Sequence, residues 1–407
     1  MTGLSTSELS VEGELRPPSA SVADAAPVSA TTGTRPGMKA RNGGIDALRA
    51  AVTLLVVFHH TAITYGAIGG WYYREIDPSK SLSGILLILF CTVNQAWFMG
   101  LFFLLAGYYT PPAYDRHGPA GFVRERLKRL GVPLLVYFFL LHPLTDALGR
   151  TATGRSFTGA FAYRLMHGKF EPGPLWFAEA LLIFAACWIV WRAIVKSQPR
   201  TTSPSFPSNA ALLAAALATG TVAFLLRLIW PVGVNVVFLQ LGYFASYTVL
   251  FFAGCAAANG RRLEQIPEDS KRIWLRVAWI ALPLLPILTV LAAHISWLAG
   301  HGEGGWNAQA LAYAFWEPFV AWGFILGLLV FFQRRFAELK GIWPSLARRA
   351  YLIYIIHPPI LVGTALAWRS VAAPALVKFV VTGSVACALC YLAAGLILRI
   401  PNAARVV

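Results

Sequence analysis

Apolar runs long enough to cross a lipid bilayer recur along this chain, and they constrain its fold more than any other feature. A membrane-spanning helix needs about 20 consecutive, mostly apolar residues. Ten segments fit this description, at about residues 45–68, 83–108, 130–148, 174–196, 209–230, 238–258, 274–298, 309–333, 346–367 and 371–398. The sequence therefore predicts an all-α integral membrane protein with about ten transmembrane helices.

The charged residues predict how these helices are oriented. The chain is 57% hydrophobic and only 13% charged, yet its formal net charge is +16. Lys and Arg gather in short loops beside the apolar runs, with 24 on one side of the predicted membrane and eight on the other. Cytoplasmic loops carry such an excess. We therefore expect both termini in the cytoplasm of a multi-pass inner (plasma) membrane protein, and no nucleic-acid partner.

The first 40 residues differ in composition from the rest. They are rich in Ser, Thr, Pro, Ala and Gly and contain no apolar run. Such a segment buries too little apolar surface to fold alone. We expect a disordered cytoplasmic tail at 1–40 and one polytopic membrane domain at 41–400, because the loops are short throughout.

The first apolar run carries ionisable residues that are costly inside a membrane. Arg49 and His60 are eleven positions apart, which places them on one helix face and ~16 Å apart along the axis. Asp46 lies one turn before Arg49 and can pair with it. Arg49 alone fits a residue that extends to the interface, and His60 alone fits a packing residue. Together they indicate the two ends of a site, with His60 as a candidate general base and His59 on another face.

The loop after the second run contains more positive charge than orientation requires. Arg124, Arg126 and Arg129 are close in sequence, and the last two are one helical turn apart. Guanidinium groups bind phosphate oxygens in a bidentate manner. The alternative is a loop that contacts anionic lipid.

Other polar residues fall inside the predicted bilayer: His142, Glu179, Glu317 and His357. Each one taken singly is more typical of a structural role, but four in one bundle indicate a polar interior passage. No metal-binding motif or cluster is present, and all five cysteines lie in apolar segments.

These motifs together resemble the membrane-bound acyltransferase family 3. The matching elements are Ile45-Asp46-Ala-Leu-Arg49 followed by His60, the aromatic run from Phe102 to Tyr108, Arg126-Leu-Lys-Arg129, Leu175-Trp176-Phe177, and the Tyr351 to Pro359 run. Within the family, the arginine-rich loop and the His357-Pro-Pro run resemble the glucan succinyl transferase branch. One departure is Pro174, which stands before Leu175 where the family often has His.

The resemblance implies transfer of an acyl group, such as acetyl or succinyl, from cytoplasmic acyl-CoA to a hydroxyl of an envelope carbohydrate or lipid. It implies no permanently bound cofactor. Arg126, Arg129 and Arg124 would bind the CoA phosphates, with Arg49 assisting, and His60 would be the catalytic base. The substrate passage would be formed by Trp176, Glu179, Glu317 and His357. Transient acylation of a histidine is an alternative that the sequence leaves open.

A proton-coupled secondary transporter is the main competing hypothesis. Ten helices with buried His and Glu residues also describe such carriers. Carriers usually contain two related halves with broken helices at matching positions, and this sequence shows neither. The sequence therefore favours the acyltransferase. It leaves the acyl group, the acceptor and the oligomeric state open.

Overall fold

The computed structural model describes residues 42–195, 205–292 and 294–403. The predicted tail at 1–40 lies outside these residues. The longer elements are α1 (Gly43–Thr64), α2 (Leu82–Arg126), α3 (Val132–Val136), α4 (His142–Arg150), α5 (Phe157–Met166), α6 (Trp176–Ile194), α7 (Asn209–Ile229), α8 (Phe244–Ala258), α9 (Glu268–Ala281), α10 (Leu284–Ala292), α11 (Ala308–Arg335), α12 (Trp343–Ala367) and α13 (Ala375–Ile397). Short π or 3-10 helices connect them: η1 (Leu127–Gly131), η2 (Tyr137–Leu141), η3 (Thr151–Thr153), η4 (Gly173–Leu175), η5 (Leu241–Tyr243), η6 (Asn259–Glu264) and η7 (Ser296–Leu298).

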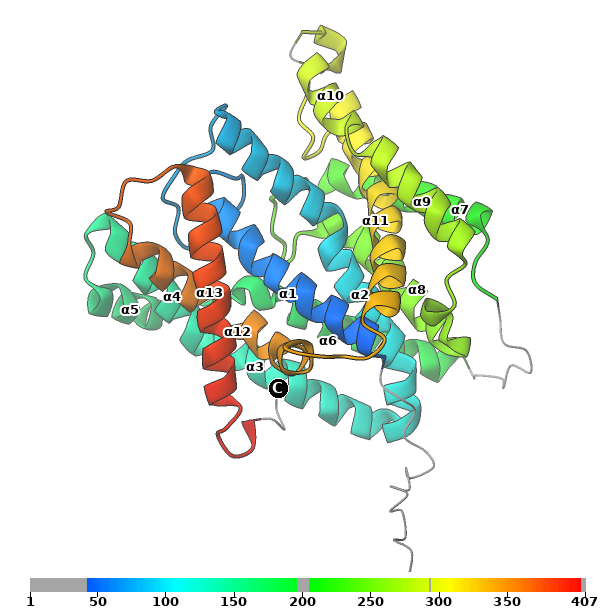
Figure 1. Ribbon diagram of the computed structural model, residues 1–407, viewed down its shortest axis with the longest axis horizontal. Helices are drawn as coiled ribbons and strands as arrows, with labels where there is room; N and C mark the ends of the chain where they lie inside the picture. The colour runs from blue at the N-terminus through cyan, green and yellow to red at the C-terminus, as the bar shows by residue number, and fades with distance from the viewer. Residues whose placement is uncertain (1–41, 196–204, 293, 404–407) are drawn as a thin grey trace, which may run out of the picture. The chain divides into compact units, whose positions relative to one another are not determined.

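Nine helical segments within the described residues are long and apolar enough to cross a membrane. One of them, Leu82–Thr153, has 72 residues and contains two of the ten predicted runs. A straight helix of that length would span ~108 Å, far more than the ~30 Å apolar core of a bilayer. The backbone turns at Gly118, where φ is 66° and ψ is 175°. Figure 1 shows the teal helix after this bend running back toward α4. With these nine segments, the all-α transmembrane prediction is confirmed for the described residues.

The α1 helix lies in the middle of the bundle and packs against α2, α11, α12 and α13. Its first turn touches the end of α11 so closely that a side chain at Gly44 would collide with the backbone of Gln333. Asn42 caps the helix by accepting the Ile45 N–H, and Asp46 in the first turn complements the helix dipole. The predicted pairing of Asp46 with Arg49 is confirmed at 3.1 Å.

The bundle has two ends with different contents. At the end where α1 begins, here called the α1-start end, Gln333 of α11 donates to the Leu263 carbonyl and Tyr351 of α12 donates to the Arg129 carbonyl. The opposite end, where α1 finishes, contains a large cavity and is called the cavity end.

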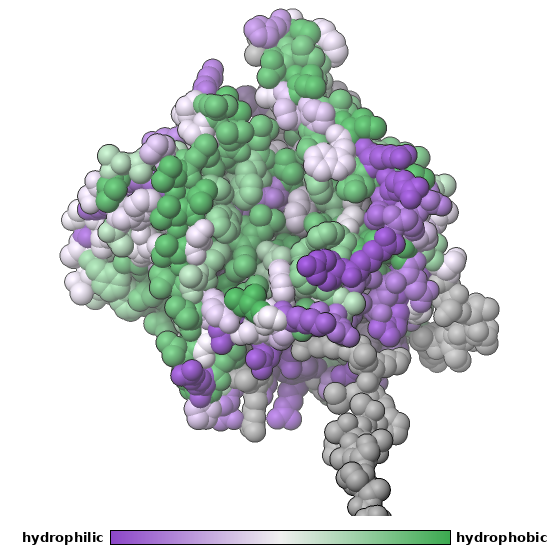
Figure 2. All heavy atoms as spheres, in the orientation of Figure 1, coloured by the Kyte–Doolittle hydropathy of each residue, from purple (hydrophilic) through white to green (hydrophobic). Residues whose placement is uncertain are grey.

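Large apolar side chains face outward along the long helices. Examples are Ile194, Leu225, Val290 and Leu396, each more than half exposed. Figure 2 shows apolar residues over most of the face that carries α13, with hydrophilic residues along the lower edge and at the lower right. Such a surface would be unstable in water and matches the apolar interior of a bilayer. The chain is a multi-pass membrane protein.

Candidate active site

A cavity of about 1910 Å³ occupies the cavity end. Its walls come from the last turns of α1, the 65–81 loop, the first half of α2, the end of α4, η4 and the loops before α8 and α11. His59 and His60 lie on its wall where it reaches α1. The cavity is large enough for a substrate of several rings.

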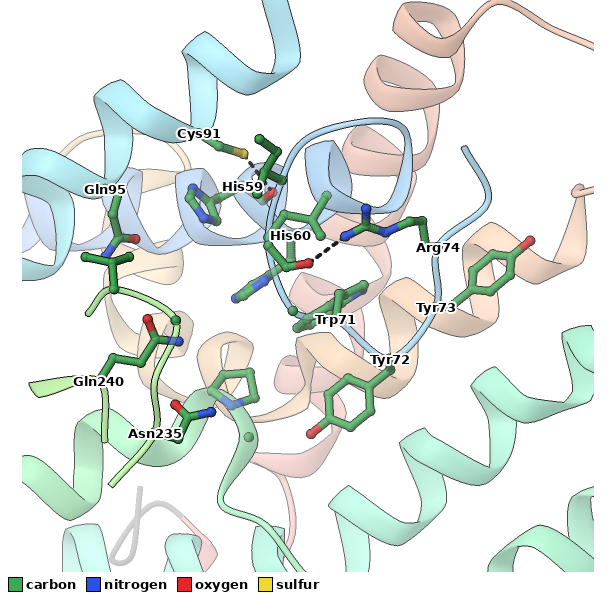
Figure 3. A pocket seen from close by; sticks show the side chains of 18 of the residues that line it. His59, His60, Trp71, Tyr72, Tyr73, Arg74, Cys91, Gln95, Asn235 and Gln240 are labelled. Atoms are coloured by element: carbon green, nitrogen blue, oxygen red, sulfur yellow. Dashed lines mark hydrogen bonds between the residues drawn. The ribbon is translucent and has the colours of Figure 1, made fainter. Parts of the chain in front are cut away.

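His60 stacks on an aromatic ring from the 65–81 loop. The ring centroids of His60 and Trp71 are 4.0 Å apart, with 14° between their planes. His357 of α12 lies almost parallel to both, at 5.3 Å from His60 and 5.9 Å from Trp71. Figure 3 shows the side chains of His60 and Trp71 close together, with Gln95, Asn235 and Gln240 to one side. The structure thus brings together two histidines that are almost 300 positions apart in sequence.

The sequence around His357 explains how its ring is held. Pro358 has no N–H for the carbonyl of Tyr354, four residues earlier. Nδ1 of His357 lies 2.7 Å from that oxygen and donates to it. Its Nε2 is buried and has no partner among the described residues. His357 is fully buried and packs behind His60, outside the residues that line the cavity.

The two neighbouring histidines of α1 have different surroundings. His59 stacks on Phe98 of α2, with ring centroids 4.9 Å apart. Nδ1 is buried without a described partner in both histidines, and both line the cavity. His59 is only 8% exposed, whereas His60 is half-buried. His60 is therefore the better placed of the two for chemistry in the cavity.

Tyr72, next to Trp71, forms hydrogen bonds with two polar side chains, Tyr137 and His142. Its hydroxyl lies 3.0 Å from the Tyr137 hydroxyl and 3.0 Å from Nδ1 of His142. Burial raises the pKa of Tyr72, so its hydroxyl keeps its proton at neutral pH. Gly173, at φ +48°, lies so close to Tyr72 that a Cβ there would collide with the hydroxyl.

Ion pairs fix the walls of the cavity. Asp146 of α4 accepts two hydrogen bonds of 2.6 Å from Arg164 and one of 2.5 Å from Arg150. These contacts to Asp146 raise the pKa of Arg164, which stays charged. On the other side, Glu75 of the 65–81 loop pairs with the buried Lys378 of α13.

The predicted passage residues separate into two groups. Trp176 lines the cavity and stacks on Tyr247 at 5.7 Å. Glu179 is half-buried on α6, away from the cavity lining, and has no hydrogen bond or ion pair to any residue described. Glu317 is buried and pairs with Arg227, which is fully enclosed and also donates to the Gly242 carbonyl at 3.0 Å.

The predicted phosphate-binding arginines lie far from the cavity lining, at the α1-start end. Arg126 is half-buried and donates to the Thr110 hydroxyl at 3.2 Å. Arg129 and Arg124 are exposed, and Arg129 lies 3.4 Å from Glu125. Arg49 is 37% exposed. The site residues predicted from sequence therefore divide between the two ends of the bundle.

Sequence reasoning missed the aromatic residues of the 65–81 loop. Trp71 and Tyr72 sit in a segment without helical periodicity, so no pattern placed them against His60 or His142. The available signal was the cluster Trp71-Tyr-Tyr-Arg74, unusually aromatic for a loop between two membrane helices. The partner of Glu317 was also missed, because Arg227 lies 90 positions earlier in the chain and no local spacing connects the two residues.

The fold and cavity define a polytopic membrane protein with a histidine-lined polar chamber. Residues 42–395 match the model of the acyltransferase 3 family, described as an acyltransferase domain. The chain belongs to this family and is a membrane acyltransferase. No curated protein and no solved structure matches it. Family membership does not favour the transporter hypothesis.

Proposed function

We propose that this enzyme transfers a short acyl group from cytoplasmic acyl-CoA to a hydroxyl group of an envelope carbohydrate or lipid. The observation that carries the proposal is the layout of α1. This helix holds His60 at the cavity wall and Arg49 at the opposite end, ~16 Å away along its axis. The donor would enter from the α1-start end and the acceptor from the cavity end, and they would meet at His60.

The arginines of the α1-start end suit the phosphates of CoA. Arg126 is held by Thr110, so its guanidinium is already oriented and partly desolvated. Arg124 and Arg129 are exposed beside it and add positive charge. With the phosphates bound there, the flexible pantetheine arm would carry the thioester along α1 toward His60, and Arg49 would orient the donor on the way. In this scheme acyl-CoA is a substrate that leaves as free CoA.

His60 would act as the general base. It takes the proton of the acceptor hydroxyl, and the hydroxyl oxygen attacks the thioester carbonyl carbon. The C–O bond forms, the C–S bond breaks, and the proton on His60 passes to the departing thiolate of CoA. A positioned base of this kind accelerates a reaction by roughly 10²–10⁴-fold. Trp71 and His357 would keep the ring of His60 in place.

A variant of this scheme keeps an acyl-histidine intermediate, which would carry the acyl group between the two substrates. The two schemes differ in one observable. An acyl-enzyme would form from acyl-CoA without acceptor and would be detected by mass spectrometry as an added acyl mass on the peptide containing His60.

The sequence resemblance suggests which substrates to test first. The glucan succinyl transferase branch makes succinyl-CoA the first donor and a glucan the first acceptor, with acetyl-CoA as the second donor. The cavity supports a saccharide, because aromatic rings such as Trp176 and amide side chains such as Gln95 and Gln240 line it together.

Release of free thiol from acyl-CoA tests the proposal. The assay uses inverted membrane vesicles that contain the enzyme, with wild type, His60→Ala and His294→Ala compared. His294 is exposed and lies outside the cavity lining, so it controls for loss of a histidine. We expect release by the wild type and by His294→Ala, and at least a hundredfold loss in His60→Ala. Equal release by His60→Ala would eliminate the base assignment, and absence of both release and CoA binding in the wild type would eliminate the donor.

A further inference from the structure

His142 is a buried histidine that the proposed reaction does not use. It lies on α4, is 2% exposed, and belongs to the residues that line the cavity. Its Nδ1 is hydrogen-bonded to the hydroxyl of Tyr72. Its Nε2 is enclosed and has no partner among the described residues. A buried ring nitrogen without a partner costs free energy, so a partner supplied from the cavity would be stabilising.

The chemistry of a neutral imidazole selects the kind of partner. If Tyr72 donates to Nδ1 of His142, then Nε2 carries the proton and needs an acceptor. If Nδ1 donates to Tyr72, then Nε2 has a lone pair and needs a donor. A hydroxyl group satisfies either tautomer, because its oxygen both donates and accepts. The charged neighbours Arg150 and Arg164 both donate to Asp146, so their guanidinium groups are directed toward that carboxylate.

The surroundings of His142 prevent its ring from turning to another partner. Tyr72 is held between Tyr137 and His142, and Gly173 leaves just enough space for its hydroxyl. The next turn of α4 is fixed by the pairing of Asp146 with Arg164. Because Nε2 is enclosed, a hydroxyl group reaches it only after a small shift of the cavity wall, while the contacts of Tyr72 keep the ring in place.

His142 and His60 are connected by a chain of neighbouring rings. His60 stacks on Trp71 at 4.0 Å, the Trp71 and Tyr72 centroids are 5.2 Å apart, and those of Tyr72 and His142 are 5.5 Å apart. A single hydroxyl group cannot reach both imidazoles across two intervening rings. A molecule with several hydroxyl groups on a rigid frame, such as an oligosaccharide, can.

We propose that Nε2 of His142 binds a hydroxyl group of the acceptor other than the one that is acylated. Because His142 fixes that hydroxyl group at one end of the Trp71–Tyr72 pair, it determines which other hydroxyl group of the acceptor faces His60 at the opposite end. His142 is thus a specificity-determining residue for a neutral, polyhydroxylated acceptor. This inference rests on the proposed function for the role of His60, but the binding itself requires no turnover.

Ligand binding to the purified full-length chain tests the subsite first. The probe is maltotriose, and permethylated maltotriose is the matched ligand without hydroxyl groups. We expect maltotriose to raise the melting temperature of the wild type and of His294→Phe, while the permethylated sugar does not. His142→Phe should weaken maltotriose binding at least tenfold. His142→Gln, whose amide reaches a similar position, should retain most of it, and Tyr72→Phe should lie between.

Analysis of the acylated product then tests whether His142 determines which hydroxyl position is acylated. With succinyl-CoA as donor and maltotriose as acceptor, the wild type should acylate mainly one hydroxyl position and His142→Phe a mixture, read by NMR of the product. His294→Phe, which lies outside the cavity lining, is the matched control and should give the wild-type product.

Several results would overturn the inference. These are no binding of maltotriose by the wild type, equal binding by His142→Phe, or parallel loss of CoA binding and sugar binding in both His142 variants. If maltotriose binding depends on His142 but no acyl-CoA releases thiol, the subsite stands and the proposed reaction fails.

Discussion

The cavity end and the α1-start end hold their polar residues in opposite ways. At the cavity end, charged and ring-nitrogen groups are buried in fixed contacts, as in the Asp146–Arg164 pair and the stack of His60 on Trp71. At the α1-start end, most of the cations are exposed, and the pair of Arg129 with Glu125 spans 3.4 Å between largely solvated groups.

Under the proposed function, this difference would let the two substrates be recognised by different physical effects. Exposed cations attract a polyanion such as CoA from a distance, but their attraction is screened by salt. Buried hydrogen-bonding groups discriminate by geometry, because each wrong ligand leaves them unpaired. We therefore expect donor binding to weaken with ionic strength and acceptor binding to be nearly insensitive to it.

The largest expected effect is on the free energy of unfolding, when a buried ion pair and an exposed ion pair each lose one partner. Glu317→Gln leaves the fully buried Arg227 without its charged partner, which should lower the free energy of unfolding by about 3–5 kcal/mol. Glu125→Gln removes the exposed pair with Arg129 and should cost less than about 1 kcal/mol. Thermal unfolding in detergent measures both. Equal destabilisation would contradict the contrast between the two ends.

Two arginine substitutions in the same segment compare how a half-buried and an exposed guanidinium group contribute to binding of acyl-CoA. Arg126→Gln removes a half-buried guanidinium group. Loss of its charge-assisted hydrogen bond to a CoA phosphate, about 1.5–3 kcal/mol, should raise the KM for acyl-CoA roughly 10–100-fold. Arg124→Gln removes an exposed cation and should raise KM less than about threefold. Thiol release over a range of acyl-CoA concentrations gives both values. Similar KM changes for the two variants would show that the loop acts only through its total charge.

Removal of the aromatic platform should affect turnover. Trp71→Ala deletes the ring stacked on His60, and a contact worth about 0.5–1.5 kcal/mol corresponds to a drop in kcat of up to about tenfold. Trp71→Phe keeps a ring and should recover most of the activity. The measurement is kcat at saturating acyl-CoA. An unchanged kcat in Trp71→Ala would show that the stack does not position His60.

The smallest expected effect is at Glu179. This carboxyl group was predicted from sequence to line the passage, but it lies outside the cavity lining. Glu179→Gln should change kcat/KM for either substrate less than about twofold. A tenfold loss would support the sequence prediction over the position seen in the structure.

The sequence predicted the features that depend on local pattern. Apolar run lengths located the spanning helices, and helical spacing paired Asp46 with Arg49. It also selected His60 as a candidate site residue, and the structure places His60 at the cavity wall. These succeed because a bilayer imposes length and polarity on each segment separately.

The parts that the sequence did not predict depend on contacts between distant segments. Trp71 reaches His60 through an irregular loop, whose path follows from anchors such as the pair of Glu75 with Lys378. Glu317 is joined to a residue 90 positions earlier, so no local spacing shows the pairing. His142 was recognised as an unusual polar residue, but its unpartnered nitrogen becomes visible only when Tyr72 is in place.

The most direct test of the central claim, that donor and acceptor reach His60 from opposite ends, is an assay of sidedness. Succinyl-CoA, which does not cross membranes, is added outside sealed vesicles of inverted and of right-side-out orientation, and released thiol is measured in each. We expect release from inverted vesicles alone, with the acylated acceptor recovered inside them. Release from right-side-out vesicles, or acylated acceptor outside the inverted ones, would contradict it.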